Sequence, residues 1–547
     1  MSGAHWIVAL GAVVLLVLPL APPAELRSTL WAFEPLRELS LPWRVLLVAL
    51  LSATLMPGIR ARFTSLAQAL GQSARVRGAA WAMALPSLFA AFVALRQRNL
   101  RLGDGAMLTQ WVELRVHTVG HQVTYDEPLE LYFHSLAYRV LHAAFDWDVA
   151  ASYGLLSALA GLAFILLLVA LWRDAAAESG APLTALAIGL SLATPSVQLF
   201  FGYVENYSLV AVASLGYALV ALRSLERGLS PLWPAAALGL AISFHVLAGW
   251  LGPSLLFVFW HHAASRTPAG RVALLAQMGA VSLVPVGLTV AAMTAVGVPV
   301  AALGETHLAA LKFIFLVPPE APYFVYPAFS AAHWRDIVNQ IALTSLAPLA
   351  LIAVVARRLP AGIWRRDARL GFFAWAAGFL HVFGLVWNAE NGAALDWDLF
   401  ALTGFFDALL AARCLQCAEF ARGDEARLQR GLPALALGVS LALGFVVSNA
   451  VRTLEIPSGH ARAHLQAGLK LDAEGSPAAA QEFDRALELD PNDPEISLRV
   501  GVRWWNAGER ERARPLLLGF LEQRPEDARS AALRALLQPD VGSEVRP

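Results

Sequence analysis

The feature that most restricts the fold of this chain is its series of apolar segments, each long enough to cross a lipid bilayer. Spanning the hydrocarbon core takes about 17 to 25 residues of helix, and lipid-facing backbone groups have to hydrogen-bond within that helix. About thirteen segments meet this requirement, and they start near positions 5, 42, 79, 150, 182, 207, 232, 250, 272, 338, 370, 397 and 432. With 57% hydrophobic and 15% charged residues, the chain is expected to be an all-α, polytopic transmembrane helix bundle.

Three clusters of arginine predict the orientation of this bundle. Arginine in short loops favours the cytoplasmic side, and counting spans puts all three clusters on the same side. They are Arg60, Arg62, Arg75 and Arg77; Arg357, Arg358, Arg365, Arg366 and Arg369; and Arg413, Arg422, Arg427 and Arg430. We therefore expect a cytoplasmic N-terminus and an extracytoplasmic tail. The first segment, WIVALGAVVLLVLPLAPPA, also resembles a signal peptide, although it lacks a basic flank.

The sequence divides into three regions. Residues 1–78 are expected to form an N-terminal transmembrane hairpin, residues 79–453 the main transmembrane domain, and residues 454–547 a helical tail. Residues 492–525 resemble a tetratricopeptide (TPR) repeat, and the preceding unit follows the same register. The positions that carry this resemblance are Ala479, Phe483, Ala486, Pro491, Gly501, Trp504, Gly508, Ala513, Phe520 and Pro525. Because so few repeats are rarely stable alone, we expect the tail to rest on the membrane domain or on a protein partner.

Polar residues gather at span ends on the predicted extracytoplasmic side. A charged side chain at the middle of a span costs roughly 2.5 to 3.5 kcal/mol, so the side on which such residues lie is informative. The five clusters are Asp104 in LRLGDGAML; Asp126 and Glu127 in TYDEPLELYFH; Glu205 and Asn206 in GYVENYS; His333, Asp336 and Asn339 in AAHWRDIVNQ; and Asp396 and Asp398 in NGAALDWDLFA. Each cluster alone is also explained by a turn, a helix cap or a solvated helix face. Five clusters on one side nevertheless predict a shared site.

The extracytoplasmic loop of residues 96–149 is expected to carry two helices on the membrane surface. Its stretches GAMLTQWVELRVHTVGH and EPLELYFHSLAYRVLHAAF are amphipathic at the helical period. Arg96, Arg98 and Arg101 lie here too, against the general arginine pattern. We expect them either to reach lipid headgroups or to bind an anionic group.

Residues 79–415 resemble the GT-C class of membrane glycosyltransferases, in which an acidic motif follows a span and surface helices come after it. The acid in GDG, Asp104, and the long loop containing a proline are similar to the bacterial protein O-mannosyltransferase-like branch. The HPP motif of that branch is absent, and YDEPLELYFH stands in its place. The resemblance implies a bacterial inner-membrane protein that transfers a sugar from a polyprenyl-phosphate donor to an extracytoplasmic acceptor.

This implied activity gives each polar cluster a role. A carboxylate has to accept the proton of the acceptor hydroxyl; Asp104 is the first candidate, and Asp126 or Glu127 is the second. The leaving phosphate needs cationic or hydrogen-bond donors, for which the candidates are Arg101, Lys312, His333 and Arg335. The remaining residues expected to line the substrate cavity are Glu205, Asn206, Asp336, Asn339, Asp396 and Asp398. A divalent cation such as Mg²⁺ or Mn²⁺ would draw on Asp104 and the acidic pair, but no spacing identifies a metal site.

Two other classes of function stay open. A transporter would carry polar residues at mid-bilayer and show symmetry between its halves, whereas these acids lie at span ends. A non-catalytic scaffold would recruit envelope proteins through the repeat tail. With 41 Lys+Arg against 41 Asp+Glu, nothing in the charge points to nucleic acid. An enzyme, unlike a scaffold, has to bring Asp104, the acidic pair and a cation into one cavity.

Overall fold

The structure, a computed structural model, describes most of the chain. The described residues are 3–21, 29–98, 100, 103–174, 176–298, 313–316, 326–389, 393–394, 396–421, 423–451, 464–465, 468–469, 472, 477, 479–525, 527 and 529–537. They fall into a membrane unit, Met1–Arg98 with Trp111–Thr453, and a tail unit, Asn99–Gln110 with Leu454–Pro547. In the described residues the regular structure is helical, apart from one isolated bridge between Phe313 and Trp387.

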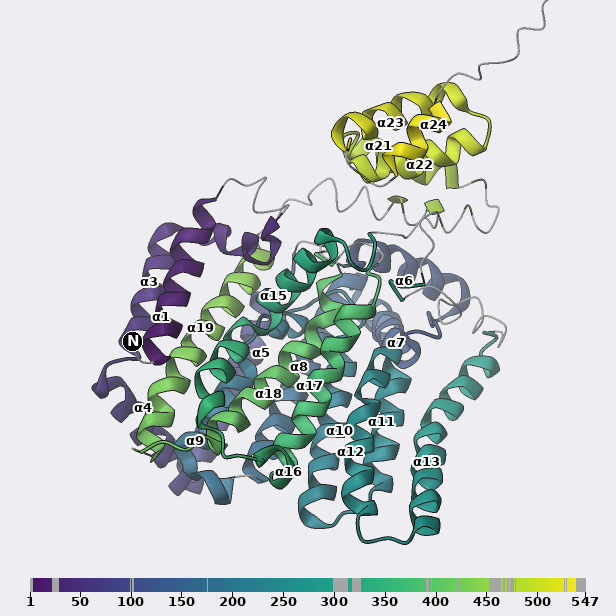
Figure 1. Ribbon diagram of the computed structural model, residues 1–547. Helices are drawn as coiled ribbons and strands as arrows, with labels where there is room; N and C mark the ends of the chain where they lie inside the picture. Colours follow the sequence, from purple (N-terminus) through teal and green to yellow (C-terminus); the bar gives the residue numbers. More distant parts are fainter. Residues whose placement is uncertain are drawn as a thin grey trace, which may run out of the picture. The chain divides into compact units, whose positions relative to one another are not determined.

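The membrane unit is a bundle of helices (Figure 1). Its elements are α1 (Gly3–Ala12) with its continuations η1 (Val13–Val17) and η2 (Leu18–Leu20), η3 (Trp31–Glu38), α3 (Leu41–Ala53), α4 (Pro57–Gln72), α5 (Ala74–Ala94), α7 (Pro128–Phe145), α8 (Val149–Asp174), α9 (Ala176–Leu192), η4 (Pro195–Phe200), α10 (Ser208–Arg227), α11 (Leu232–Phe244), η5 (Val246–Leu251), α12 (Gly252–Ala263), α13 (Pro268–Ala295), α15 (Ala331–Val355), η6 (Ala356–Arg358), α16 (Ile363–Arg366), α17 (Ala368–Val386), η7 (Trp397–Phe400), α18 (Ala401–Cys417) and α19 (Gly423–Val451). Helix α6 (Gly105–Val119) begins in residues of the tail unit and ends in residues of the membrane unit.

A helix occupies every predicted span position, so the chain is a polytopic helical membrane protein as the sequence predicts. Among the described residues, eight helices are long and apolar enough to cross a membrane, or nine if the bent pair α3 and α4 forms one span. Helices α11 and α12 have only 13 and 12 residues, which at about 1.5 Å per residue covers roughly 20 Å of a core about 30 Å thick. They are short because the chain leaves the helical conformation at His245.

The described residues of the three arginine clusters, which exclude Arg422, lie at one end of this bundle, which we call the arginine end. Arg413 pairs with Asp367, which joins the second cluster to the third. Arg60 lies 3.9 Å from Glu425, which joins the first cluster to the start of α19. Arg60 lies on α4, a helix bent by 79° from α3 rather than an open loop. The shared end is the arrangement that the span count predicts, and the side of the membrane that it faces stays a prediction.

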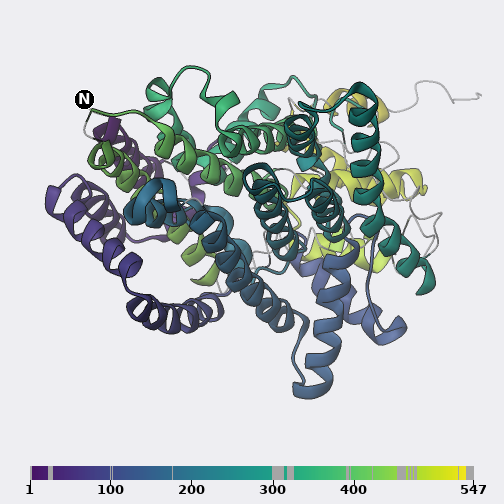
Figure 2. The same cartoon turned by 90° about the horizontal axis from the view of Figure 1, so that it is seen from below.

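Helices α3, α4, α5 and α13 present apolar surface outward. The most apolar windows of α5 and α13 are only 6% and 17% buried, and α3 exposes Trp43 and Leu50. In Figure 2, α3 to α5 lie in purple at the rim of the bundle. Exposed apolar side chains on helices of this length indicate contact with lipid.

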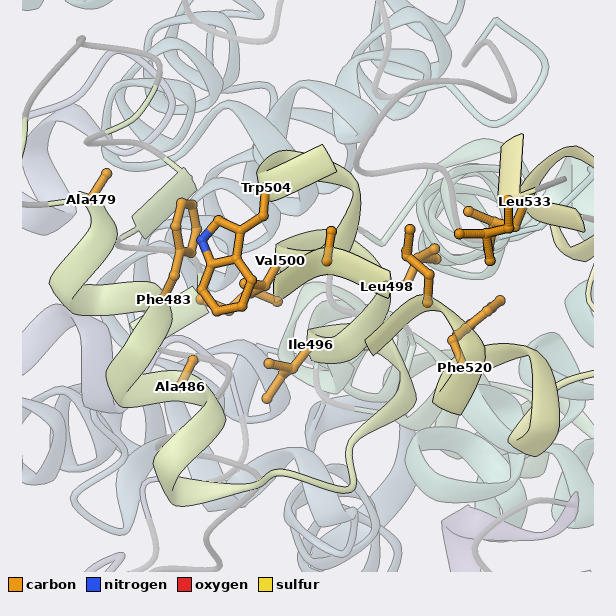
Figure 3. Close-up of a cluster of buried hydrophobic side chains, with 13 residues drawn as sticks. Ala479, Phe483, Ala486, Ile496, Leu498, Val500, Trp504, Phe520 and Leu533 are labelled. Atoms are coloured by element: carbon orange, nitrogen blue, oxygen red, sulfur yellow. The ribbon is translucent and has the colours of Figure 1, made fainter. Parts of the chain in front are cut away.

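The tail unit has its own hydrophobic core. Its described helices are α21 (Ala479–Leu489), α22 (Pro494–Asn506), α23 (Arg510–Gln523) and α24 (Ser530–Leu537). Phe483, Trp504 and Phe520 point into one buried cluster (Figure 3). At Gly501 a Cβ would come within 2.7 Å of Leu517, so close packing of α22 on α23 favours glycine there. These are positions that the repeat pattern expects to be buried, and the TPR assignment itself stays a prediction.

Candidate active site

Chain segments far apart in the sequence meet at the end of the membrane unit opposite the arginine end, which we call the acidic end. The turn of residues 201–207 is held by Gln97, whose backbone N–H donates to Phe201 O at 2.7 Å and whose Oε1 accepts from Val204 N at 3.0 Å. Gly202 permits this turn because its φ is +63° and a Cβ would lie 2.6 Å from Arg96 Cβ. The backbone N–H of Val246 donates to the Asp126 carbonyl at 2.9 Å, which brings the break after α11 to the start of α7.

Glu127 is held at the centre of this end by Asn206. The Asn206 Nδ2 donates to Glu127 Oε2 at 2.6 Å, and its Oδ1 accepts from the hydroxyl of Tyr153 at 3.0 Å. Because a hydroxyl must be the donor to Oδ1, the amide has its Nδ2 turned toward the carboxylate. The structure therefore joins one residue from each of two predicted pairs, Glu127 and Asn206, in one hydrogen-bonded chain.

His245 is a further neighbour of Glu127 that the sequence analysis did not single out. Its Nδ1 accepts from the backbone N–H of Leu247 at 3.1 Å, and its ring stacks on Tyr207 at 4.9 Å. Since Nδ1 is the acceptor, the ring proton is on Nε2, which lies 3.4 Å from Glu127 Oε1. That distance is longer than the roughly 2.7–2.9 Å of a charge-assisted hydrogen bond, and such contacts often tighten when substrate binds.

Tyr207 marks where the carboxylates of the acidic end converge. Burial raises the pKa of its hydroxyl well above the usual value, and four negative side chains raise that pKa further. In order of effect these are Asp398, Glu127, Glu205 and Asp396. Acidic residues from three of the five predicted clusters thus lie close enough to one tyrosine to raise its pKa.

Glu130 and His134 support the same region from the face of α7. The two Glu130 oxygens accept the backbone N–H groups of Leu209 and Val210, each at 2.7 Å. This carboxylate therefore caps α10, where a negative charge is favoured by the helix dipole. His134 Nε2 lies 3.6 Å from Glu130, and its ring stacks on Tyr153 at 3.8 Å. Both side chains are fully buried, which indicates a positioning role.

Asp398 is built into the turn before α18. Its Oδ2 accepts from the Tyr203 hydroxyl at 3.0 Å and its Oδ1 from the backbone N–H of Leu399 at 3.0 Å. Trp397 Nε1 donates to the same tyrosine oxygen at 2.7 Å. Asp398 and Trp397 are only 2% and 1% exposed, and their contacts join two turns. The predicted role of Asp398 in lining a substrate cavity stays a prediction.

The polar face of α15 mainly holds the segment that follows α1. Asp336 Oδ1 accepts from Trp31 Nε1 at 3.0 Å, and Asn339 Oδ1 accepts from the backbone N–H of Ala32 at 3.1 Å. His333 is buried, with Tyr326 stacked on it at 5.4 Å. Burial raises the Tyr326 pKa first, and Asp336 and then, more weakly, Asp396 raise it further. Asp336 and Asn339 therefore hold the segment that follows α1. Asp396 lies near enough to Tyr326 to raise its pKa.

Several predicted site residues have no described place in this network. Arg101 and Lys312 lie outside the described residues. Asp104 begins α6 by accepting the backbone N–H of Leu108 through its carbonyl at 2.8 Å, and it belongs to the tail unit. Its predicted proximity to Asp126 or Glu127 stays a prediction. Arg335 is exposed on α15.

The described residues do not fit a metal site at this end. Within them, no group of three or more His, Cys, Asp and Glu side chains is arranged around a common point. Glu127 Oε2 instead receives an N–H from Asn206, whose positive end would repel a cation. The divalent cation considered from the sequence, Mg²⁺ or Mn²⁺, stays a prediction.

Comparison with known proteins finds structural neighbours but no family. No family model matches the sequence, and no curated protein matches it. The crystal structure of ArnT from Cupriavidus metallidurans bound to undecaprenyl phosphate is similar at 15% identity and a TM-score of 0.49, covering 73% of this chain and 81% of that chain. The apo structure of that ArnT is similar at 15% identity and a TM-score of 0.42, covering 72% and 81%. Because both TM-scores are below 0.5, neither assigns this chain to a family.

Proposed function

We propose that this protein is a membrane glycosyltransferase that moves a sugar from a polyprenyl-phosphate donor to an acceptor hydroxyl at the acidic end. The observation that supports this most is the setting of Glu127, which Asn206 and His245 flank at a bundle end. A base has to be held in a fixed direction to accept a proton efficiently. The chain from Tyr153 through Asn206 to Glu127 provides that fixed direction.

In this proposal Glu127 is the general base. The acceptor oxygen attacks the anomeric carbon of the sugar while Glu127 takes the hydroxyl proton. The bond from that carbon to the phosphate oxygen breaks, and its electron pair leaves with the polyprenyl phosphate. Such proton transfer contributes typically 10²- to 10⁴-fold to the rate. Asp104, the first candidate from the sequence, stays the alternative base.

The leaving phosphate carries negative charge and requires donors on its side of the sugar. We propose that cations supply these donors, and the candidates from the sequence are Arg101, Lys312, His333 and Arg335. Arg96 and Arg98 join them because both are exposed beside the turn of residues 201–207. We place this end outside the cytoplasm, in keeping with the arginine rule.

We also propose that the tail unit is a TPR-like module that binds a protein partner in the cell envelope. What supports this is the burial of Phe483, Trp504 and Phe520 at pattern positions. A chain stopped after Arg452 should then keep the membrane unit folded and lose the partner.

The test of the enzyme proposal is turnover by the purified full chain. The protein would be incubated with labelled polyprenyl-phosphate sugars, and the release of polyprenyl phosphate would be measured. We expect release by the wild type and its loss in Glu127→Gln. If a broad donor panel gives no release while the folded protein binds an envelope protein, the scaffold alternative is correct instead.

A further inference from the structure

The membrane unit has a polar pocket at the arginine end, remote from the proposed active site. Its volume is about 770 Å³, and α4, the start of α9 and the start of α19 line it. The polar residues of this lining are Arg60, Thr64, Ser65, Gln68, Gln72, Asp424 and Glu425. Those on α4 follow one face of the helix at helical spacing. Asp424 and Glu425 lie across the pocket from them, on α19.

The charges of this pocket have opposite signs on its two walls. Arg60 is only 9% exposed, and its Nη1 donates to the Leu55 carbonyl at 2.7 Å. Its Nη2 lies 3.9 Å from Glu425 Oε1, about 1 Å longer than a charge-assisted hydrogen bond. Glu425 is 63% exposed on the facing wall. The guanidinium and the carboxylate are therefore close enough to bind one ligand together. They are too far apart to form a short hydrogen bond with each other.

The position of the pocket indicates what kind of molecule reaches it. Helix α4 turns by 79° at the end of α3, as a helix does when it leaves a span to lie along the membrane surface. Its neighbours α3 and α5 both expose apolar surface, which indicates lipid on either side. The pocket thus lies at the depth of the phospholipid headgroups, where phospholipid is the most abundant ligand.

We propose that this pocket binds the headgroup of a phospholipid that carries both a phosphate and a primary ammonium group. Arg60 takes the phosphate, because a guanidinium presents paired N–H donors to phosphate oxygens. Glu425 accepts the ammonium N–H groups, whereas its neighbour Asp424 already pairs with Arg427 at 2.7 Å. Thr64, Ser65 and Gln68 offer hydroxyl and amide groups to the ester oxygens. The Glu425 carboxylate disfavours an anionic headgroup that lacks the amine.

The test is lipid binding by the purified full chain, measured by native mass spectrometry. Short-chain phosphatidylethanolamine, phosphatidylglycerol and phosphatidylcholine would be added separately. We expect phosphatidylethanolamine to bind about tenfold or more tightly than phosphatidylglycerol, the difference typical of one charge-assisted contact. Equal binding of all three lipids, or no binding, would overturn the proposal.

Three variants separate the two halves of the site. Arg60→Gln should weaken all three phospholipids about tenfold, whereas Glu425→Gln should remove only the preference for phosphatidylethanolamine. Arg62→Gln is the matched control, because Arg62 is exposed on the same helix and does not line the pocket. If Arg62→Gln weakens binding as much as Arg60→Gln, general surface charge explains the binding and the site is refuted. If Arg60→Gln does not fold, Glu425→Gln decides the question, since that side chain is exposed.

Discussion

The two ends of the membrane unit hold their carboxylates in different ways. At the arginine end, Asp367 pairs with Arg413, and Glu226 pairs with Arg369. At the acidic end, the described donors include the neutral amide of Asn206 for Glu127. An arginine neutralises a carboxylate and ties helix ends together, whereas an amide orients a carboxylate without removing its charge. The first arrangement stabilises a fold, and the second suits a group that has to accept a proton.

The first test of this comparison is which side of the membrane each end faces, because each reporter fusion gives an all-or-none result. Reporter fusions after Gly270 and after Arg366 should both report a cytoplasmic location, because the arginine end is expected inside. A fusion after Pro494 should report the opposite side. Activity of an alkaline phosphatase reporter against that of a cytoplasmic reporter provides the measurement. A cytoplasmic signal from the Pro494 fusion would put the tail on the wrong side for the proposed function.

The largest effect on turnover is expected from Glu127→Gln. This change keeps the size of the side chain and removes its basicity, so polyprenyl phosphate release should fall about 10²- to 10⁴-fold. The melting temperature should fall modestly, since the glutamine oxygen still accepts the N–H of Asn206 but its N–H₂ group then faces the N–H of His245.

The control for that variant is Asp104→Asn, measured in the same assay. If Glu127→Gln loses less than about tenfold while Asp104→Asn loses more than a hundredfold, the base is Asp104. Glu127 would then be a residue that positions the acceptor.

At the arginine end, Arg369→Met should affect stability and not chemistry. Arg369 is 2% exposed, contacts both oxygens of Glu226, and donates to the Leu171 carbonyl at 3.0 Å. Breaking a buried pair by removing one partner costs about 3 to 5 kcal/mol. Denaturant unfolding in detergent should show this loss, with turnover per folded molecule unchanged. A loss of turnover without a loss of stability would contradict the assignment of stability to the arginine end and of chemistry to the acidic end.

The sequence predicted both ends of the bundle but not the details of the acidic one. The arginine positions and the number of spans between them predict that three clusters distant in the sequence share one end. That prediction depends only on the span count and on the preference of arginine for cytoplasmic loops. The pairs 126–127 and 205–206 were singled out as polar groups at span ends, and Asn206 and Glu127 do contact each other.

Other parts of the site had weak signals or none. Glu130 and His134 stand four residues apart on an amphipathic helix, which a search for buried i,i+4 pairs would find. His245 sits alone in the apolar run AISFHVLAGW, where a core histidine is the ordinary interpretation. Trp31 and Asp336 are separated by 305 positions, and nothing local in either segment indicates that pairing.

A smaller effect is expected from Asp398→Asn, the other buried acid of the acidic end. Its two oxygens accept from Tyr203 and from the backbone of Leu399, and an asparagine retains only one of these acceptors. Stability should fall by roughly 1 to 3 kcal/mol, the cost of one buried group left without its partner. Turnover should fall less than about tenfold, well short of Glu127→Gln. A hundredfold loss of turnover would place Asp398 in contact with substrate.

The smallest effect is a dependence on pH at the arginine end. Burial raises the pKa of Asp367, but the hydrogen bonds and charge of Arg413 outweigh burial, and the pKa lies below its usual 3.8. The folded protein therefore keeps this carboxylate charged where the unfolded chain has begun to protonate it. Because the folded pKa is the lower one, the stabilisation is complete above about pH 4 and is lost as the pH falls through the folded pKa.

The measurement is the difference in melting temperature between the wild type and Asp367→Asn. That difference should be constant from about pH 7 to 5 and should shrink below about pH 4. Arg413→Gln is the matched variant, since it removes the same ion pair from the other side. Its difference in melting temperature from the wild type should shrink over the same pH range. The opposite result, a gap that widens on acidification, would mean that burial dominates and that the Asp367 pKa is raised. The arginine end would then hold a carboxylate whose charge its arginine does not stabilise, and the contrast between the two ends would fail.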